Sequence, residues 1–408
     1  MAMPEKLTRR GGFMNIKVLT LAVAASFAIS AQAAADKVVG FYPYWSQYSQ
    51  FYPKDIRYDF VTHVNYVSLT PSSDGSVAWA DENDAGNFKA LVDSAANHNV
   101  KVVVTIGGIE MESVFQEISA NSELTQTFAN NVVAWLDEHG GSGVEIDWQN
   151  LSAESAAPVA EEAPTAEEPN FEEGATEEGA SSEEPASEPV AAPAAAGGNG
   201  FGTLLSALKS AFAGKYTLSA TVYPFSSLEA YSSDVINDLD YATVFIPDQM
   251  SEEETTLKPS QSATLISEGL EKLTGKGVEA SKLIPVINLY GRTFAGATGL
   301  GSSHNGIGSG NEGYIPYKEL MSLFDTPDYK VSFDEDSKSE VAVSAMESIV
   351  FMGIPSVKSV AQNIKSGDFG GVAVYDISQD HHEPIVSLLV TIGLELRPEI
   401  SYKPKKKK

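Results

Sequence analysis

The chain of 408 residues carries 27 Lys and Arg against 55 Asp and Glu, a net charge of −28, and it contains no cysteine. This length accommodates one α/β barrel of about 250 residues with insertions. The negative charge argues against nucleic acid and anionic membrane surfaces as partners. The lack of cysteine excludes disulfides, thiolate nucleophiles, Cys-ligated zinc and a lipoprotein anchor.

Residues 1–33 have the organisation of a secretory signal peptide. Basic residues between Lys6 and Lys17 precede an apolar run at 18–29, which is followed by Ala31-Gln32-Ala33. A positive start, a short apolar middle and an A-x-A ending predict cleavage after Ala33. A run of about twelve apolar residues is too short to span a bilayer. We therefore expect an exported protein, periplasmic or secreted, with no stable membrane insertion after cleavage.

Short apolar strands alternate with amphipathic helices along the remaining chain, and this alternation predicts βα units around a parallel sheet. The expected strands begin at 38, 61, 101, 143, 217, 241, 283 and 371, and the expected helices lie at 83–96, 124–139, 201–212, 260–274, 357–364 and 384–396. Eight such strands predict an α/β fold of the (β/α)8 TIM barrel type, formed by residues 36–150 and 201–396.

Two insertions and a tail interrupt this pattern. Residues 151–200, after the fourth strand, are rich in Ala, Glu and Pro, and twelve glutamates lie between Glu154 and Glu188. Such a segment cannot bury enough apolar surface to offset its ordering entropy, so it is predicted to be disordered. It is either a solvated linker or a site for a basic protein partner or Ca²⁺. Residues 295–352 predict a small α+β insertion after the seventh strand, and 397–408 form a basic tail.

The fourth strand carries acidic residues on one side only. Apolar and polar residues alternate along it, and a period of two places them on opposite faces. The apolar face consists of Val144, Ile146 and Trp148, and the other face of Gly143, Glu145, Asp147 and Gln149. An apolar outer face packed on helices, with polar groups inside near the C-terminal mouth, is typical of a parallel barrel.

Ser142–Gln149 resembles the D-G-x-D-x-D-x-E signature of glycoside hydrolase family 18, the chitinases and chitinase-like proteins. Ser142, Glu145 and Asp147 take the places of its three Asp residues, and Gln149 falls where the family has its proton-donating Glu. Further stretches similar to the family follow in the order that a barrel requires. They are Gly40–Trp45, Thr62–Tyr66, Thr105–Gly108, Tyr290–Phe294, Glu312–Tyr314 and Gly370–Tyr375, with Tyr375 in place of the usual Trp.

The resemblance implies a mechanism that this chain only partly retains. In the family, the Glu protonates the glycosidic oxygen while the N-acetyl carbonyl of the substrate attacks the anomeric carbon, and the Asp two residues earlier orients the acetamido group. Gln149 cannot titrate in this role. Pro247 stands where the family has a Tyr that holds the acetamido group. We therefore expect a chitinase-like protein that binds N-acetylglucosamine-type glycans such as chitin oligomers, with little or no hydrolysis.

The resemblance assigns catalytic positions to Gln149, Asp147 and Glu145. The residues expected to contact the glycan are Tyr42, Trp45, Gly107, Gly108, Trp148, Asp248, Tyr290, Arg292 and Tyr375. No cofactor is implied, and no metal site is expected because no H-E-x-x-H pattern occurs.

Other interpretations stay open. The aromatic residues can belong to the core, and Glu145 with Asp147 can be a hydrogen-bonded pair that stabilises the barrel interior. Arg292 can pair with a buried carboxylate, and Asp248 can act as a relocated acid. The alternative functions are an active glycosidase, of chitinase or endo-N-acetylglucosaminidase type with an altered acid, and a non-catalytic protein-interaction scaffold.

Overall fold

The computed structural model describes residues 35–151, 200–250 and 254–400, all within one compact unit that begins at Ala33. The predicted signal peptide, nearly all of the acidic insertion and the end of the basic tail lie outside the described residues. No helix in the described part of the chain is both long enough and apolar enough to cross a membrane.

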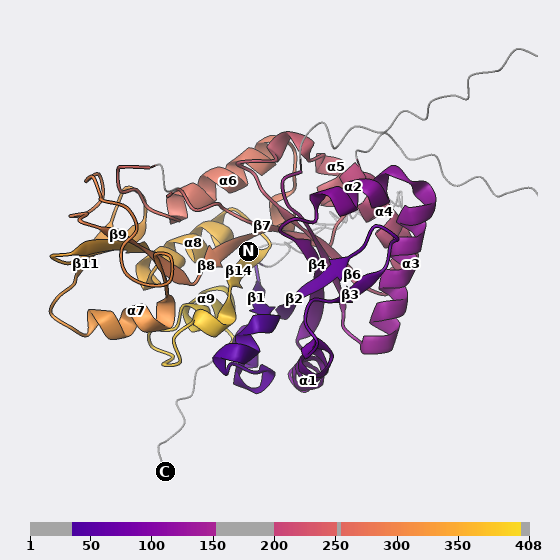
Figure 1. The fold of residues 1–408 in the computed structure, drawn as a ribbon, viewed down its shortest axis with the longest axis horizontal. Helices are drawn as coiled ribbons and strands as arrows, with labels where there is room; N and C mark the ends of the chain where they lie inside the picture. Colours follow the sequence, from indigo (N-terminus) through magenta and orange to yellow (C-terminus); the bar gives the residue numbers. More distant parts are fainter. Residues whose placement is uncertain (1–34, 152–199, 251–253, 401–408) are drawn as a thin grey trace, which may run out of the picture. The chain divides into compact units, whose positions relative to one another are not determined.

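Eight parallel strands close into a barrel, which confirms the predicted (β/α)8 fold (Figure 1). Each strand pairs with its neighbours in parallel, and β1 pairs with both β2 and β14 to complete the ring. A short strand, β3 (Val77–Trp79), extends β2 in antiparallel orientation. The barrel strands are β1 (Lys37–Pro43), β2 (His63–Pro71), β4 (Lys101–Gly108), β5 (Gly143–Trp148), β6 (Thr217–Val222), β7 (Tyr241–Val244), β8 (Leu283–Asn288) and β14 (Gly371–Tyr375).

Helices surround the barrel, and several begin at capping residues that the sequence supplies. Asn121 accepts hydrogen bonds from the backbone N–H groups of Glu123 and Leu124, and Ser262 and Ser387 cap later helices in the same way. The helices are α1 (Asp84–Ala96), α2 (Glu112–Ala120), α3 (Ser122–His139), α4 (Gly200–Phe212), α5 (Ser233–Asn237), α6 (Ala263–Gly275), α8 (Ile354–Ser366) and α9 (Leu388–Leu396). Short 3-10 helices are η1 (Tyr44–Ser49), η2 (Pro53–Asp55), η3 (Tyr58–Phe60), η4 (Leu228–Ala230), η5 (Ala280–Lys282) and η6 (Ile377–Gln379).

The alternating faces of β5 lie as the sequence predicts. Trp148 is fully buried outside the ring, where it stacks on Phe115 of α2 at 5.2 Å and contacts Phe201 of α4 at 6.4 Å between ring centroids. Glu145 points the other way and is equally buried inside the barrel, where Asn65 of β2 contacts it. The strand therefore contributes to the helix-covered core with one face and to the barrel interior with the other.

The insertion after the seventh barrel strand forms a second sheet, and it begins earlier than predicted. The stretch Tyr290–Phe294, which resembles the end of the family's seventh strand, instead belongs to a separate strand at Tyr290–Ala295 that pairs with Glu347–Phe351. A period of two is the same in either sheet, so the alternation did not reveal the partner. The sheet has the order β10-β9-β13-β12-β11. Its elements are β9 (Tyr290–Ala295), β10 (Tyr314–Pro316), α7 (Tyr317–Phe324), β11 (Lys330–Asp334), β12 (Ser339–Val343) and β13 (Glu347–Phe351).

Candidate functional site

A hydrogen-bonded carboxylate occupies the C-terminal end of β5. The Tyr223 hydroxyl donates to Asp147 Oδ1 at 2.6 Å, and Gln149 Nε2 donates to Oδ2 at 2.9 Å. All three side chains are half-buried. Burial raises the pKa of Asp147, and the donors from Tyr223 and Gln149 oppose that rise. Two donors thus hold the carboxylate in one orientation at the barrel mouth.

Glu145 lies deeper in the barrel and has a separate set of donors. Asn65 Nδ2 donates to its Oε2 at 3.0 Å, and Thr221 Oγ1 donates to its Oε1 at 3.2 Å. Burial, followed by the charge of Asp147, raises the pKa of Glu145 to about 8. No hydrogen bond within the described part of the chain joins Glu145 to Asp147, and each carboxyl accepts from other residues. Glu145 has no access to solvent in the barrel interior.

Three aromatic rings contact one another inside the barrel. Phe41 of β1 contacts Phe245 and Tyr375 with centroid distances of 5.8 and 5.6 Å, and Phe245 contacts Tyr375 at 5.7 Å. The ring of Phe245 also lies 5.9 Å from that of Tyr223. Tyr375 was singled out from the sequence, whereas Phe41 and Phe245 were not.

Asp248 connects the barrel to the inserted sheet. Arg292 of β9 forms a buried ion pair with Asp248 and also donates to the Tyr314 hydroxyl at 3.0 Å. The backbone N–H of Met250 donates to the other Asp248 oxygen at 2.9 Å. Tyr290 packs edge-on against Tyr314 at 5.1 Å. The structure thus gives Arg292 the carboxylate partner that the sequence left open, and both oxygens of Asp248 are engaged.

The two glycines that end β4 leave room for the backbone and for Asp147. Both have positive φ, +110° at Gly107 and +115° at Gly108, which L-residues rarely adopt. A Cβ at Gly107 would lie 2.4 Å from the carbonyl oxygen of Asp147, and one at Gly108 would lie 3.9 Å from Asp147 Oδ2. Gly108 is therefore next to the carboxylate, and Gly107 permits close approach of β4 to β5.

Two residues predicted to contact the glycan lie in the core instead. Tyr42 is fully buried and donates to Asn87 Oδ1 of α1 at 3.0 Å, and Trp148 packs against α2 and α4. Both occupy outward positions of their strands, so the same alternation that places Phe41 and Asp147 inside excludes Tyr42 and Trp148 from the mouth. Trp45 follows β1 and remains 41% exposed.

Tyr223 was missed, although the sequence contains a signal for it. Ser219 and Thr221 face the interior of β6 and donate to Glu145. Tyr223 is the next inward position of this alternation and lies one residue beyond the end of β6. Phe245 holds the same position after β7. Following each inward face past the end of its strand would have identified both residues. Among residues 35–151, 200–250 and 254–400, no group of three or more His, Cys, Asp or Glu side chains could hold a metal ion.

Comparisons with known proteins agree with the barrel fold. A solved structure of Ostrinia furnacalis Group IV chitinase in complex with allosamidin matches with a TM-score of 0.72 and 19% identity, covering 90% of this chain and 100% of that one. Chitinase 1 of Aphanocladium album is 23% identical over 82% of this chain and 79% of that protein. Chitinase A1 of Niallia circulans is 26% identical over 34% of this chain, and the match spans 27% of that protein's length. Residues 37–380 match the model of Glycosyl hydrolases family 18, and the chain belongs to this family.

Proposed function

We propose that the barrel mouth binds N-acetylglucosamine-type glycans such as chitin oligomers and hydrolyses them little or not at all. One observation carries the proposal. The Gln149 amide, which the resemblance aligns with the family's acid, donates a hydrogen bond to Asp147 over 2.9 Å. An amide in this position can donate to a glycosidic oxygen but has no proton to transfer near neutral pH.

The other carboxyls near the mouth are poorly placed to replace the missing acid. Glu145 is sealed inside the barrel. Asp248 is paired with Arg292, and a general acid must instead lie within hydrogen-bond reach of the leaving oxygen. Both oxygens of Asp147 accept hydrogen bonds from Tyr223 and Gln149, which suits a carboxylate that orients a ligand. The ring of Phe245 packs against Tyr223, which holds Asp147, and against Tyr375, and these rings supply apolar surface.

A binding titration tests the proposal. The full chain is titrated with chitin oligomers by calorimetry, beside Asp147→Asn and, as a matched control, Asp93→Asn on the exposed side of α1. We expect saturable binding by the native chain, unchanged binding by Asp93→Asn, and affinity lower by about tenfold or more in Asp147→Asn. Absence of binding by the native chain at millimolar oligomer would end the proposal.

We also propose that residues 1–33 direct export. The support is the charged start, the apolar run and the Ala31-Gln32-Ala33 ending. Mass spectrometry of the protein recovered from cells tests this directly: a mature N-terminus at Ala34 is expected, and an uncleaved chain contradicts it.

Deletion of residues 152–199 tests whether the acidic segment recruits a basic protein partner, because an unchanged set of co-purifying proteins would leave it a solvated linker.

A further inference from the structure

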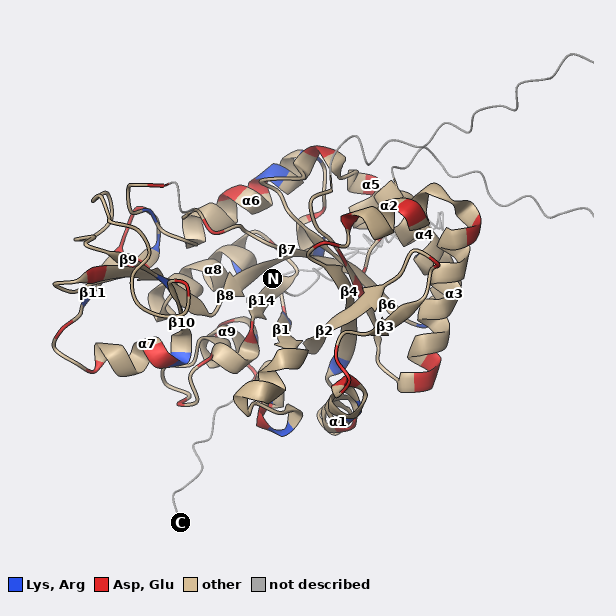
Figure 2. Ribbon diagram, viewed as in Figure 1, with Lys and Arg blue, Asp and Glu red and all other residues tan. Residues whose placement is uncertain are grey.

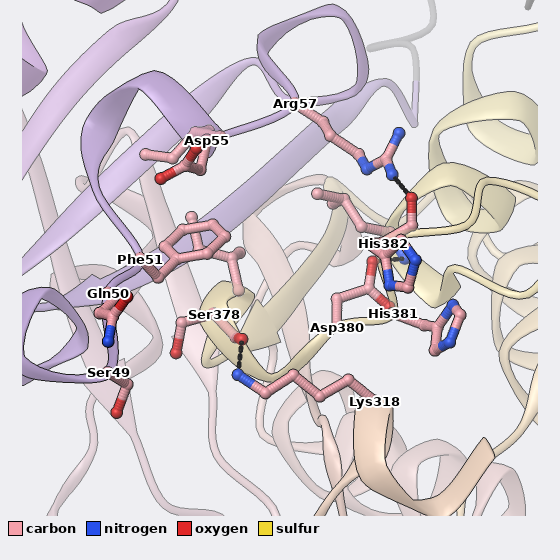
Figure 3. Close-up of a pocket in the computed structure, with 13 residues that line it drawn as sticks. Ser49, Gln50, Phe51, Asp55, Arg57, Lys318, Ser378, Asp380, His381 and His382 are labelled. Carbon is pink, nitrogen blue, oxygen red and sulfur yellow. Dashed lines mark hydrogen bonds between the residues drawn. The ribbon is translucent and has the colours of Figure 1, made fainter. Parts of the chain in front are cut away.

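A concave site, here called the side pocket, includes none of the residues described above at the barrel mouth. It lies between the β1–β2 connection and the segment after β14, and its volume is about 490 Å³ (Figure 3). The lining comes from residues 49–51 and 55–57, from Lys318 of α7 and Leu389 of α9, and from five residues between 377 and 382. Pockets that hold small organic molecules have volumes of about 300–1,000 Å³.

One wall of the side pocket carries two half-buried cations that contact backbone carbonyls. Arg57 donates to the carbonyl oxygen of His382, and Lys318 Nζ donates to the carbonyl oxygen of Ser378 at 2.9 Å. Neither side chain forms an ion pair with any carboxylate of the described residues. A guanidinium has five N–H donors and an ammonium three, so each retains donors beyond the one bound to a carbonyl.

The carboxylates near these cations are engaged elsewhere. Asp380 accepts from Ser387 and from the backbone N–H of Leu388 at 2.9 Å. Asp55 accepts from the backbone N–H of Tyr52 at 2.9 Å. Asp376 accepts from the backbone N–H of Ser378 at 2.6 Å; burial raises its pKa, and this hydrogen bond opposes the rise more than the charge of Lys318 does. The local acids therefore receive hydrogen bonds from their own segments.

A histidine adds a further donor to this wall. The Nδ1 atom of His381 accepts from the backbone N–H of Glu383 at 3.0 Å, so Nε2 carries the proton in the neutral ring. The His381 ring stacks on His382 at 4.6 Å between centroids. Figure 3 places both imidazoles on the same side of the pocket as Arg57 and Lys318.

The facing wall is aromatic and polar. Figure 3 shows the Phe51 ring directed into the pocket from the β1–β2 connection, with Gln50 and Ser49 beside it. The Tyr42 hydroxyl lies 3.1 Å from the carbonyl oxygen of Phe51, and this oxygen and Asn87 Oδ1 share its single proton. An aromatic ring opposite cationic donors suits a sugar with an acidic group, because the pyranose ring can pack on the aromatic ring while the oxyanion pairs with the cations.

We propose that the side pocket binds a sugar-sized organic anion, with its carboxylate or phosphate between Arg57 and Lys318 and its ring against Phe51. The chain as a whole has a net charge of −28 and repels anions. Figure 2 shows Asp and Glu on α2, α3 and α6, basic residues also on α6, and adjacent acidic and basic residues on α7. Affinity for an anion at this place therefore depends on the local donors. The proposal does not depend on glycan binding at the mouth.

Calorimetric titration of the full chain with three probes tests the ligand class. Glucuronate and glucose 6-phosphate are the anionic probes, and glucose is the neutral one of the same size. We expect at least one anion to bind with a Kd below about 1 mM, and the tighter of the two identifies the oxyanion. Saturation of the mouth with chitin oligomers should leave this affinity unchanged. Equal affinity for glucose, or no binding of either anion at 10 mM (about −2.7 kcal/mol), overturns the proposal.

Matched variants localise the binding. The double change of Arg57→Gln and Lys318→Gln is expected to weaken anion binding by about tenfold or more, whereas Lys330→Gln, on the exposed β11, should leave it unchanged. Lysine acetylation of the native chain gives a readout that requires no variant. The anion should slow acetylation of Lys318 and not of Lys330. Equal protection of both lysines, or full binding by the double variant, contradicts the assignment.

Discussion

Restoring a titrating acid at residue 149 is the most direct test of the reasoning. In Gln149→Glu, the new carboxyl takes the place of an amide nitrogen that lies 2.9 Å from Asp147 Oδ2. Two carboxyls at this distance cannot both ionise readily, so they share one proton and the pKa of the pair's second ionisation rises. Burial already raises the pKa of Asp147 and acts in the same direction. The variant should therefore retain a neutral acid near pH 7.

General acid catalysis contributes about 10²–10⁴-fold, which corresponds to about 3–5 kcal/mol of barrier. We expect kcat/KM for a fluorogenic chitobioside to rise by at least about 10²-fold in Gln149→Glu. Its activity should be present below the pKa of the new acid and be lost as the pH rises through it. The matched control is Gln126→Glu, the same change on the exposed side of α3, which should leave the rate at the native level.

Two results would refute this account. If the native chain hydrolyses the substrate as fast as Gln149→Glu, the amide is not what limits the reaction. If Gln149→Glu binds chitin oligomers normally and remains as slow as the native chain, a missing acid is not the cause. Calorimetric titration of the same preparations distinguishes a slow chemical step from lost binding.

Three further predictions follow from the contacts of the barrel interior. Tyr223→Phe removes the 2.6 Å hydrogen bond that opposes the raised pKa of Asp147, so that pKa should rise further. We expect an upward shift in the pH midpoint of oligomer binding, and an unchanged midpoint contradicts the prediction. Native Glu145 keeps its proton up to about pH 8 whereas the unfolded chain loses it above about 4.5, so the free energy of unfolding should fall between these pH values by up to about 1.4 kcal/mol per pH unit. Glu145→Gln should flatten this dependence in urea unfolding at pH 5 and pH 8, and equal slopes in both proteins would disprove it. Trp148→Ala should lower the free energy of unfolding by about 3–5 kcal/mol, while the folded fraction binds oligomers normally. Loss of oligomer binding without loss of stability would instead indicate that Trp148 contacts the glycan.

The sequence by itself determined the barrel and the face of each strand. Alternation along β5 separated Trp148 from Asp147 because successive side chains of a strand point to opposite sides. Applied to β1, the same rule would have separated Tyr42 from Phe41. The spacing of strands and helices defined the βα units, since parallel strands require long crossovers between them. These properties are local, and one stretch of chain contains all the information they need.

Only the tertiary structure decided which inward residues meet. Tyr223 and Asp147 are separated by 76 positions, and their contact depends on the register of neighbouring strands. The pairing of Arg292 with Asp248 likewise required the strand at 290–295 to join the inserted sheet. A period of two specifies the face of a strand and not its partner, so distant hydrogen bonds follow from closure of the barrel and not from the local pattern.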